Sequence, residues 1–190
     1  MPTKSTKNLQ GRPEPGAESG GKTGRLELTI QRATRARGIP PDEEFRKWIG
    51  AALSEDKKDM EIGLRIVNES EGRRLNRDFR HKDYATNVLT FVYGDSPILA
   101  GDIVLCASVI KKEAARQCKD LAAHYAHLTV HGILHLQGFD HDIDERAEAM
   151  ERLETEILAG LGYENPYDET SVSAAGRDDR NSGGDGTCHA

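Results

Sequence analysis

The sequence predicts an α+β domain in which a small mixed sheet of four strands packs against about five helices. Short segments of alternating or β-branched apolar residues occur at four places, and amphipathic segments with helical periodicity occur at five. They follow one another in the order β-α-β-α-β-β-α-α-α. Strands that are joined both through helices and directly to each other favour a mixed sheet with helices packed on it.

Four strands are predicted from apolar patterns. Residues 26–30 and 62–66 alternate between apolar and other side chains, as expected of half-buried strands. Residues 86–93 are rich in β-branched and aromatic side chains, and residues 102–106 form a short apolar run. We therefore expect these four segments to form the sheet.

Five helices are predicted between and after the strands. The first begins near Pro40, with acids in its first turn, and a stripe that includes Trp48. The second is short, with Ser70 as its expected N-cap. Helices at about 107–118 and 120–137 follow, and the last runs from about 144 to 161. The apolar stripe of the last helix consists of Ala147, Met150, Leu153 or Glu154, Ile157 and Leu161.

The composition of the 190-residue chain predicts one domain between two tails. Residues 1–24 and 164–190 are rich in small and polar side chains and cannot bury enough apolar area to offset the entropy of ordering. We expect both to be disordered and the domain to span residues 25–163. The sequence contains neither a long apolar run nor a signal-peptide pattern, so we expect a cytoplasmic protein that does not enter a membrane.

The most informative motif is the run from His131 to His141, which has the spacing HxxxHxxGxxH. His131 and His135 share one face of the helix predicted at 120–137, and Gly138 can adopt the left-handed conformation that ends a helix. The chain can then turn and bring His141 to the same ion. Three neutral imidazoles leave the fourth tetrahedral position of zinc open, which is typical of a catalytic site. We therefore predict one Zn²⁺ ion near the end of a central helix.

Gly132 argues against the protease that such spacing otherwise suggests. Metallopeptidase helices carry HExxH, and the Glu is the general base. Here Gly132 occupies the position of that Glu. The sequence thus retains the metal ligands of that motif and lacks its base.

Two further residues near the motif are candidates for supporting roles. His127 lies one helical turn before His131, and we expect it to hold a ligand or a backbone group instead of binding the ion directly. Asp140 precedes His141 and can either orient an imidazole or serve as a turn residue.

A local basic segment contrasts with the net charge of −6. Between residues 65 and 82 lie six basic and three acidic side chains, so this segment can attract a polyanion although the whole protein is acidic. Arg80 ends the second predicted helix. Its guanidinium can bind a phosphate in bidentate fashion or form a salt bridge, for example with Asp83.

The chain resembles the YbeY family of bacterial rRNA-maturation endoribonucleases. The resemblance lies in three stretches, residues 75–91, 101–105 and 127–141, and the last contains the HGxLHLxGxDH string with Gly132 in place of the peptidase Glu. Together with the final helix these stretches span nearly all of 25–163. The departures from the family pattern are Phe79, Ala85, Thr90 and Val92.

The resemblance implies an α+β metalloprotein with one zinc ion held by His131, His135 and His141. It implies single-strand-specific RNA cleavage, maturation of the 3′ end of the small-subunit rRNA, and ribosome quality control. The implied partners are single-stranded rRNA, the small ribosomal subunit and its assembly factors. The functionally important arginine of the family falls on Arg80.

These features together predict a zinc-dependent endoribonuclease. Zinc-bound water would be the nucleophile, or the RNA 2′-OH would attack with the metal as Lewis acid, and Arg80 would bind the phosphate. Two alternatives remain. One is a non-catalytic ribosome-assembly factor in which zinc only stiffens the fold, and the other is a zinc-dependent peptidase or amidase, which Gly132 disfavours.

Overall fold

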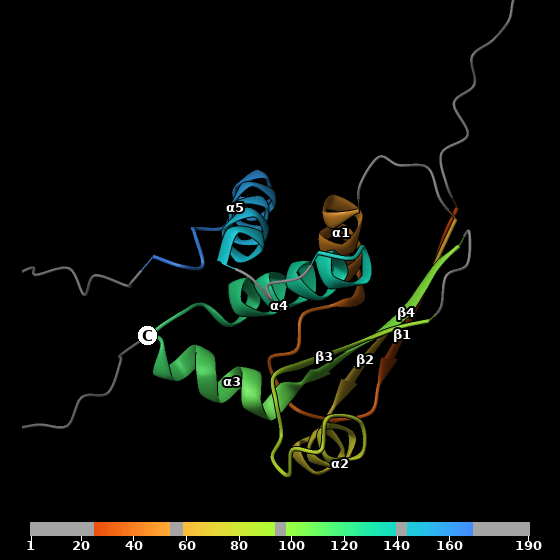
Figure 1. Cartoon of the computed structure of the whole chain (residues 1–190). Helices are drawn as coiled ribbons and strands as arrows, with labels where there is room; N and C mark the ends of the chain where they lie inside the picture. The colour runs from red at the N-terminus through yellow and green to blue at the C-terminus, as the bar shows by residue number, and fades with distance from the viewer. Residues whose placement is uncertain (1–24, 54–58, 94–97, 140–143, 169–190) are drawn as a thin grey trace, which may run out of the picture.

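The computed structural model describes residues 25–53, 59–93, 98–139 and 144–168 and confirms the predicted α+β class. Nine elements follow one another within these ranges (Figure 1). They are β1 Leu26–Arg32, α1 Asp42–Ala52, β2 Met60–Val67, α2 Glu69–Arg80, β3 Val88–Val92, β4 Leu99–Cys106, α3 Ala107–Arg116, α4 Leu121–Leu136 and α5 Asp144–Gly160. No helix in these ranges is long and apolar enough to cross a membrane.

The four strands form one mixed sheet in the order β1-β2-β4-β3. β1, β2 and β4 are parallel, with Leu64 of β2 opposite Ile103 of β4. β3 runs antiparallel to β4 and forms an edge, with Thr90 opposite Ile103. The mixed sheet was expected, and the insertion of β4 between β2 and β3 completes its topology.

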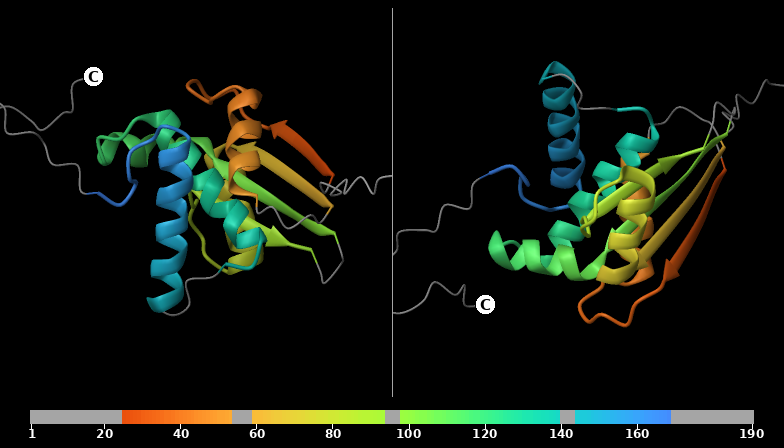
Figure 2. Two further views of the ribbon diagram at one scale, coloured as in Figure 1. Left: turned by 90° about the horizontal axis from the view of Figure 1, so that it is seen from above. Right: turned by 60° about the horizontal axis from the view of Figure 1, so that its bottom comes forward.

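Helices cover the two faces of the sheet unequally. Ile103 and Leu105 of β4 point into the larger core, which includes Trp48 of α1 and Ile133 of α4. Val104, and Cys106 two positions further along the strand, point to the other face, into a smaller core beside α2. Helix α5 packs against α4 on the side away from the sheet (Figures 1 and 2). Helix α4 is therefore enclosed between the sheet and α5.

The start of α2 differs from the prediction. The helix begins at Glu69, and the side chain of Asn68 caps it by accepting a hydrogen bond from the backbone N–H of Glu71 at 2.9 Å. Ser70, the expected cap, lies within the first turn. An asparagine side chain can satisfy a free helical N–H as well as serine can, so the extended backbone of Asn68 decided which residue became the cap.

Gly132 allows α4 to lie directly against β4. A Cβ atom at this buried position would lie 3.0–3.3 Å from side-chain atoms of Ile103, which is closer than ordinary van der Waals contact. Position 132 therefore faces the core, whereas His131 and His135 lie on the adjacent, partly exposed face of the helix. A glutamate there would have to displace Ile103, so this packing is incompatible with the peptidase motif.

We expect Gly132→Glu to destabilise the fold by several kcal/mol, because the change both overpacks the core and buries a charge. The matched control is Gly50→Glu in α1, since Gly50 is exposed and has no atom within 4 Å of its would-be Cβ. That control should stay within about 0.5 kcal/mol of the parent protein. Urea unfolding of the three proteins measures both effects, and equal stabilities would contradict the packing described for position 132.

Candidate metal centre

Helix α4 holds the two candidate ligands that fall within the described residues. The helix starts at a cap in which the Asp120 carboxylate accepts from the N–H of Ala123 at 2.9 Å, and it is buried along most of its length. His131 and His135 are one turn apart and partly exposed. Their exposure leaves this short stretch of α4 accessible from solvent.

The ring nitrogens of these histidines converge on one point. Nε2 of His131 lies 3.1 Å from Nε2 of His135, and the rings are nearly perpendicular at 85° with centroids 4.5 Å apart. Two imidazole nitrogens bound to one tetrahedral zinc ion at about 2.0–2.1 Å would be roughly 3.3–3.4 Å apart. The observed separation is thus close to that of two ligands of one ion.

The other nitrogen of each ring is held by a hydrogen-bond acceptor. Nδ1 of His135 lies 2.9 Å from the backbone carbonyl of Phe139, and Nδ1 of His131 lies 2.7 Å from Oε1 of Glu154. A carbonyl oxygen can only accept, so Nδ1 of His135 carries a proton. When both rings are neutral, each Nε2 then carries a lone pair, and a cation between the rings could bind to both nitrogens. The donor set therefore fits a metal ion.

Glu154 of α5 is fully buried and bridges two histidines. Its Oε1 accepts from His131, and its Oε2 lies 2.9 Å from Nε2 of His127 and also accepts from the hydroxyl of Tyr167. Burial alone would raise the pKa of this carboxyl, but the hydrogen bonds from His127, His131 and Tyr167 outweigh it and lower the pKa to about 2. Glu154 is therefore ionised at neutral pH and accepts from both rings.

Sequence reasoning missed the role of Glu154 and of Tyr167. Position 154 was an alternative to Leu153 within the apolar stripe of the last helix, and Tyr167 was assigned to the C-terminal tail. An acid at a stripe position was the available signal, because a buried carboxylate requires partners. His127, expected to support a ligand, lies beside both residues, with its ring centroid 6.3 Å from that of His131.

The end of α4 matches the predicted turn. Gly138 adopts a left-handed backbone with φ of 89°, and its N–H donates to the carbonyl of His135 at 3.0 Å. His141, the third predicted ligand, and Asp140 lie outside the described residues. Within the described ranges no three metal-binding side chains are grouped together, and the complete ligand set stays a prediction.

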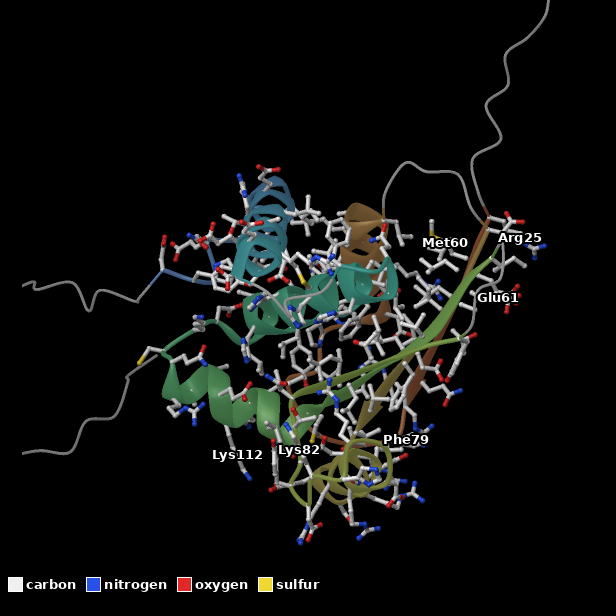
Figure 3. The ribbon with its side chains drawn as sticks, in the orientation of Figure 1. Arg25, Met60, Glu61, Phe79, Lys82 and Lys112 are labelled. Atoms are coloured by element: carbon white, nitrogen blue, oxygen red, sulfur yellow. The ribbon has the colours of Figure 1, made fainter. Side chains whose placement is uncertain are left out.

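Among the described residues, no hydrogen bond, ion pair or ring contact joins Arg80 to the histidine pair. It is the exposed last residue of α2, which packs on the face of the sheet opposite α4. Its neighbour Phe79, which is labelled in Figure 3, contacts Phe91 of the edge strand β3, with ring centroids 4.9 Å apart. A substrate that touches both Arg80 and the histidine pair would therefore have to pass around this edge of the sheet.

Ion pairs neutralise much of the basic segment around Arg80. The alternative partner Asp83 is bound by Arg73 at 2.6 Å, while Arg77 pairs with the adjacent Asp78 at 3.1 Å. Glu71 pairs with Arg65 at 2.8 Å. In the described part of the chain no ion pair involves Arg80. Its guanidinium is thus available to an anionic ligand.

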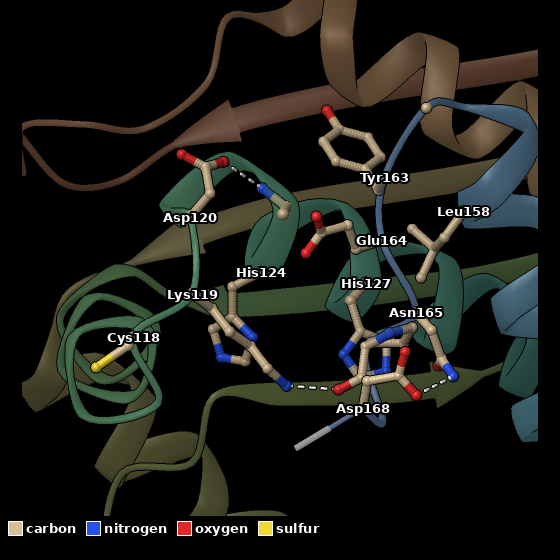
Figure 4. A pocket seen from close by; sticks show the side chains of 13 residues that line it. Cys118, Lys119, Asp120, His124, His127, Leu158, Tyr163, Glu164, Asn165 and Asp168 are labelled. Carbon is tan, nitrogen blue, oxygen red and sulfur yellow. Dashed lines mark hydrogen bonds between the residues drawn. The ribbon is translucent and has the colours of Figure 1, made fainter. Parts of the chain in front are cut away.

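A cavity of about 920 Å³ lies further back along α4, between its first turns and the segment after α5 (Figure 4). His124 and His127 line it together with the acids Asp120, Glu164 and Asp168 and with Lys119, whose ammonium donates to the carbonyl of Pro166 at 2.5 Å. Three acids against one lysine disfavour a phosphate, so we do not place RNA in this cavity.

Comparison with known proteins connects this geometry to a family. The sequence model described as Endoribonuclease YbeY matches residues 30–162. The chain belongs to the YbeY family. An endoribonuclease YbeY from Nitrosospira multiformis is 54% identical over 179 residues, covering 86% of this chain and 93% of the relative. The one from Aromatoleum aromaticum is 60% identical over 147 residues, covering 75% and 93%.

The family predicted from the sequence is thereby confirmed, and the chain spans nearly the full length of these YbeY relatives. Among solved structures, the solution structure of a protein from Thermotoga maritima matches 74% of this chain and 99% of its own, at 22% identity and a TM-score of 0.47.

The ionised state of Glu154 predicts an acid-sensitive contribution to stability. Because the pKa is lowered from 4.5 to about 2, this contribution is complete above pH 4.5 and is lost as the pH falls from 4.5 towards 2. The stability difference between the parent protein and Glu154→Gln should therefore shrink over that range. Urea unfolding at several pH values measures it, with Glu148→Gln, an exposed position of α5, as the control. A difference that stays constant would contradict the assignment.

Proposed function

We propose that this chain is a zinc-dependent endoribonuclease that cleaves single-stranded RNA, and that it acts in maturation of the 3′ end of the small-subunit rRNA and in ribosome quality control. The observation that carries the proposal is the convergence of the His131 and His135 Nε2 atoms, 3.1 Å apart, in a chain of the YbeY family. Its partners would be the small ribosomal subunit and its assembly factors, in the cytoplasm.

His131, His135 and His141 would hold one zinc ion. Zinc held by three imidazoles supplies a Lewis acid and lowers the pKa of a bound water to about 7. The carbonyl of Phe139 and the carboxylate of Glu154 favour the tautomer in which Nδ1 of each described ring carries the proton and Nε2 the lone pair that would bind the metal. Both supporting contacts leave the opposite, partly exposed side of the rings open to a substrate.

Arg80 would bind a phosphate oxygen of the RNA and stabilise the charge that develops there. Arg80 is exposed and forms no ion pair with another described residue, and both observations support this role. Because α2 lies on the far face of the sheet, the RNA would pass round the β3 edge to reach both groups. An extended single strand can follow such a curved path more easily than a stiff duplex, which supports single-strand specificity.

We also propose that residues 25–163 form the domain and that the segments 1–24 and 164–190 are tails. The start of the second tail is held to the domain, because Tyr167 contacts Glu154 and Lys119 donates to Pro166. The tail would therefore leave the domain close to the cavity beside α4.

A non-catalytic assembly factor is the second candidate function. The separation of Arg80 from the histidine pair favours it, as does the absence, among the described residues around the pair, of a free acid or base positioned for proton transfer. In that case the metal would act on stability alone. A peptidase is disfavoured, because the buried position 132 has no room for the general base.

We expect cleavage of a single-stranded rRNA 3′ fragment to require both the histidine pair and Arg80. His135→Ala should reduce cleavage to the background of the assay, and so should removal of zinc with a chelator. Arg80→Ala should lower the rate by about 100-fold, the order of loss when one donor to developing charge is removed. Rates should be measured together with the zinc content of each preparation.

The matched control for Arg80 is Arg77→Ala, which removes a guanidinium from the same helix that is already paired with Asp78. It should retain cleavage within about threefold, the scatter expected of a surface change. Parent-like cleavage by metal-free His135→Ala would identify a contaminating nuclease and contradict the proposal. Loss of stability without any zinc-dependent cleavage in the parent protein would support the assembly factor instead.

A further inference from the structure

A buried hydrogen-bonded chain connects the segment after α5 to the candidate ligand His131. The Tyr167 hydroxyl donates to Oε2 of Glu154, and Oε1 of the same carboxylate accepts from Nδ1 of His131 at 2.7 Å. Met150 and Leu158, one turn before and one turn after Glu154, are buried at 2% and 1% exposure. Glu154 thus occupies the centre of an apolar stripe, where only its specific partners offset the cost of burial.

We propose that Glu154 and Tyr167 are positioning residues that set the metal affinity of the histidine pair through His131. This inference rests on the proposed metal centre and extends it to residues on α5 and beyond. The Glu154 carboxylate would fix the tautomer and the ring orientation of His131, and Tyr167 would hold the carboxylate in the rotamer that allows this.

The two described ligands are held by different kinds of acceptor. His135 donates to a neutral carbonyl, whereas His131 donates to a carboxylate, which makes the opposite ring nitrogen a stronger donor to a metal. Because Oε2 is held by Tyr167 and His127, rotation of the carboxylate away from His131 would break several hydrogen bonds at once. His131 is therefore the more strongly oriented ligand.

A second carboxylate–imidazole pair on the same helix provides a matched control. Oε2 of Glu113 lies 3.0 Å from Nε2 of His124, and the Asn87 side chain also donates to it at 3.0 Å. The chemistry matches that of Glu154 with His131. The hydrogen bonds of Glu113 described above involve neither His131 nor His135. Replacing Glu113 therefore shows the effect of disrupting a carboxylate–imidazole pair on α4 that does not include a candidate ligand.

The experiment measures Zn²⁺ affinity by competition with a chromophoric chelator for the full-length parent protein, Glu154→Gln, Tyr167→Phe and Glu113→Gln. Glu154→Gln should bind about 10- to 100-fold more weakly, as expected when a partner of a ligating histidine is lost. Tyr167→Phe should lose about 2- to 10-fold, the equivalent of one hydrogen bond. Glu113→Gln should stay within about twofold of the parent protein, because it contacts neither ligand.

Two further readouts separate positioning from a merely structural role. The visible absorption of the Co²⁺-loaded protein should change in Glu154→Gln and stay unchanged in Glu113→Gln. Thermal unfolding of the metal-free proteins records how much each change affects the fold itself. A purely structural Glu154 would lower the melting temperature without altering the Zn²⁺ affinity or the Co²⁺ spectrum.

Parent-like affinity of Glu154→Gln, or an equal loss in Glu113→Gln, would overturn the inference while leaving the metal centre in place. A parent protein that binds no Zn²⁺ would overturn the metal centre and this inference with it. If Glu154→Gln does not fold, the comparison of Tyr167→Phe with Glu113→Gln decides, because both variants alter the hydrogen bonds of a carboxylate that is paired with a histidine of α4. Equal affinities of these two variants would then reject the positioning role.

Discussion

The hydrogen bond between the Glu154 carboxylate and Nδ1 of His131 is the contact on which the geometry of the candidate site depends. It fixes one ring on α4 by a charge carried on α5, and the carbonyl of Phe139 fixes the other ring. With both Nδ1 atoms held by acceptors, the two Nε2 atoms lie 3.1 Å apart. When both rings are neutral, each Nε2 carries a lone pair that can bind a cation between them. The arrangement of the two rings therefore favours binding of a cation between them.

The packing of α4 limits which reactions a cation bound at this site could support. Gly132 brings the helix against Ile103, so this face of α4 is packed in the core, and His131 and His135 lie on the adjacent, partly exposed face. The motif shares its ligand spacing with metallopeptidases, yet the residue at the position of their general base is Gly132, and the side chain of Ile103 occupies the space beside it. If a metal binds here, the described residues place no general base at position 132, and a site of this kind would suit a reaction in which docking of a large substrate supplies much of the selectivity. Arg80, on the far side of the β3 edge, extends the surface that such a substrate would contact.

Local rules predicted the parts of the site that are close in sequence. The four-residue spacing of His131 and His135 places both on one helical face, and Gly138 takes the left-handed turn that its lack of a Cβ permits. Glu154 lies 23 residues from His131, and only the packing of α5 on α4 brings them together. The strand order and the choice of Asn68 over Ser70 as a cap likewise depend on tertiary placement. A buried acid in an apolar stripe was the one sequence signal of this longer-range contact.

Zinc K-edge X-ray absorption of the zinc-loaded protein tests the central claim most directly. It reports the number and type of atoms bound to the metal and their distances. We predict one zinc ion per chain with imidazole nitrogens at about 2.0–2.1 Å, and loss of imidazole scattering in a variant that lacks His131. A shell made only of oxygen ligands, or one that is unchanged when His131 is removed, would contradict the account.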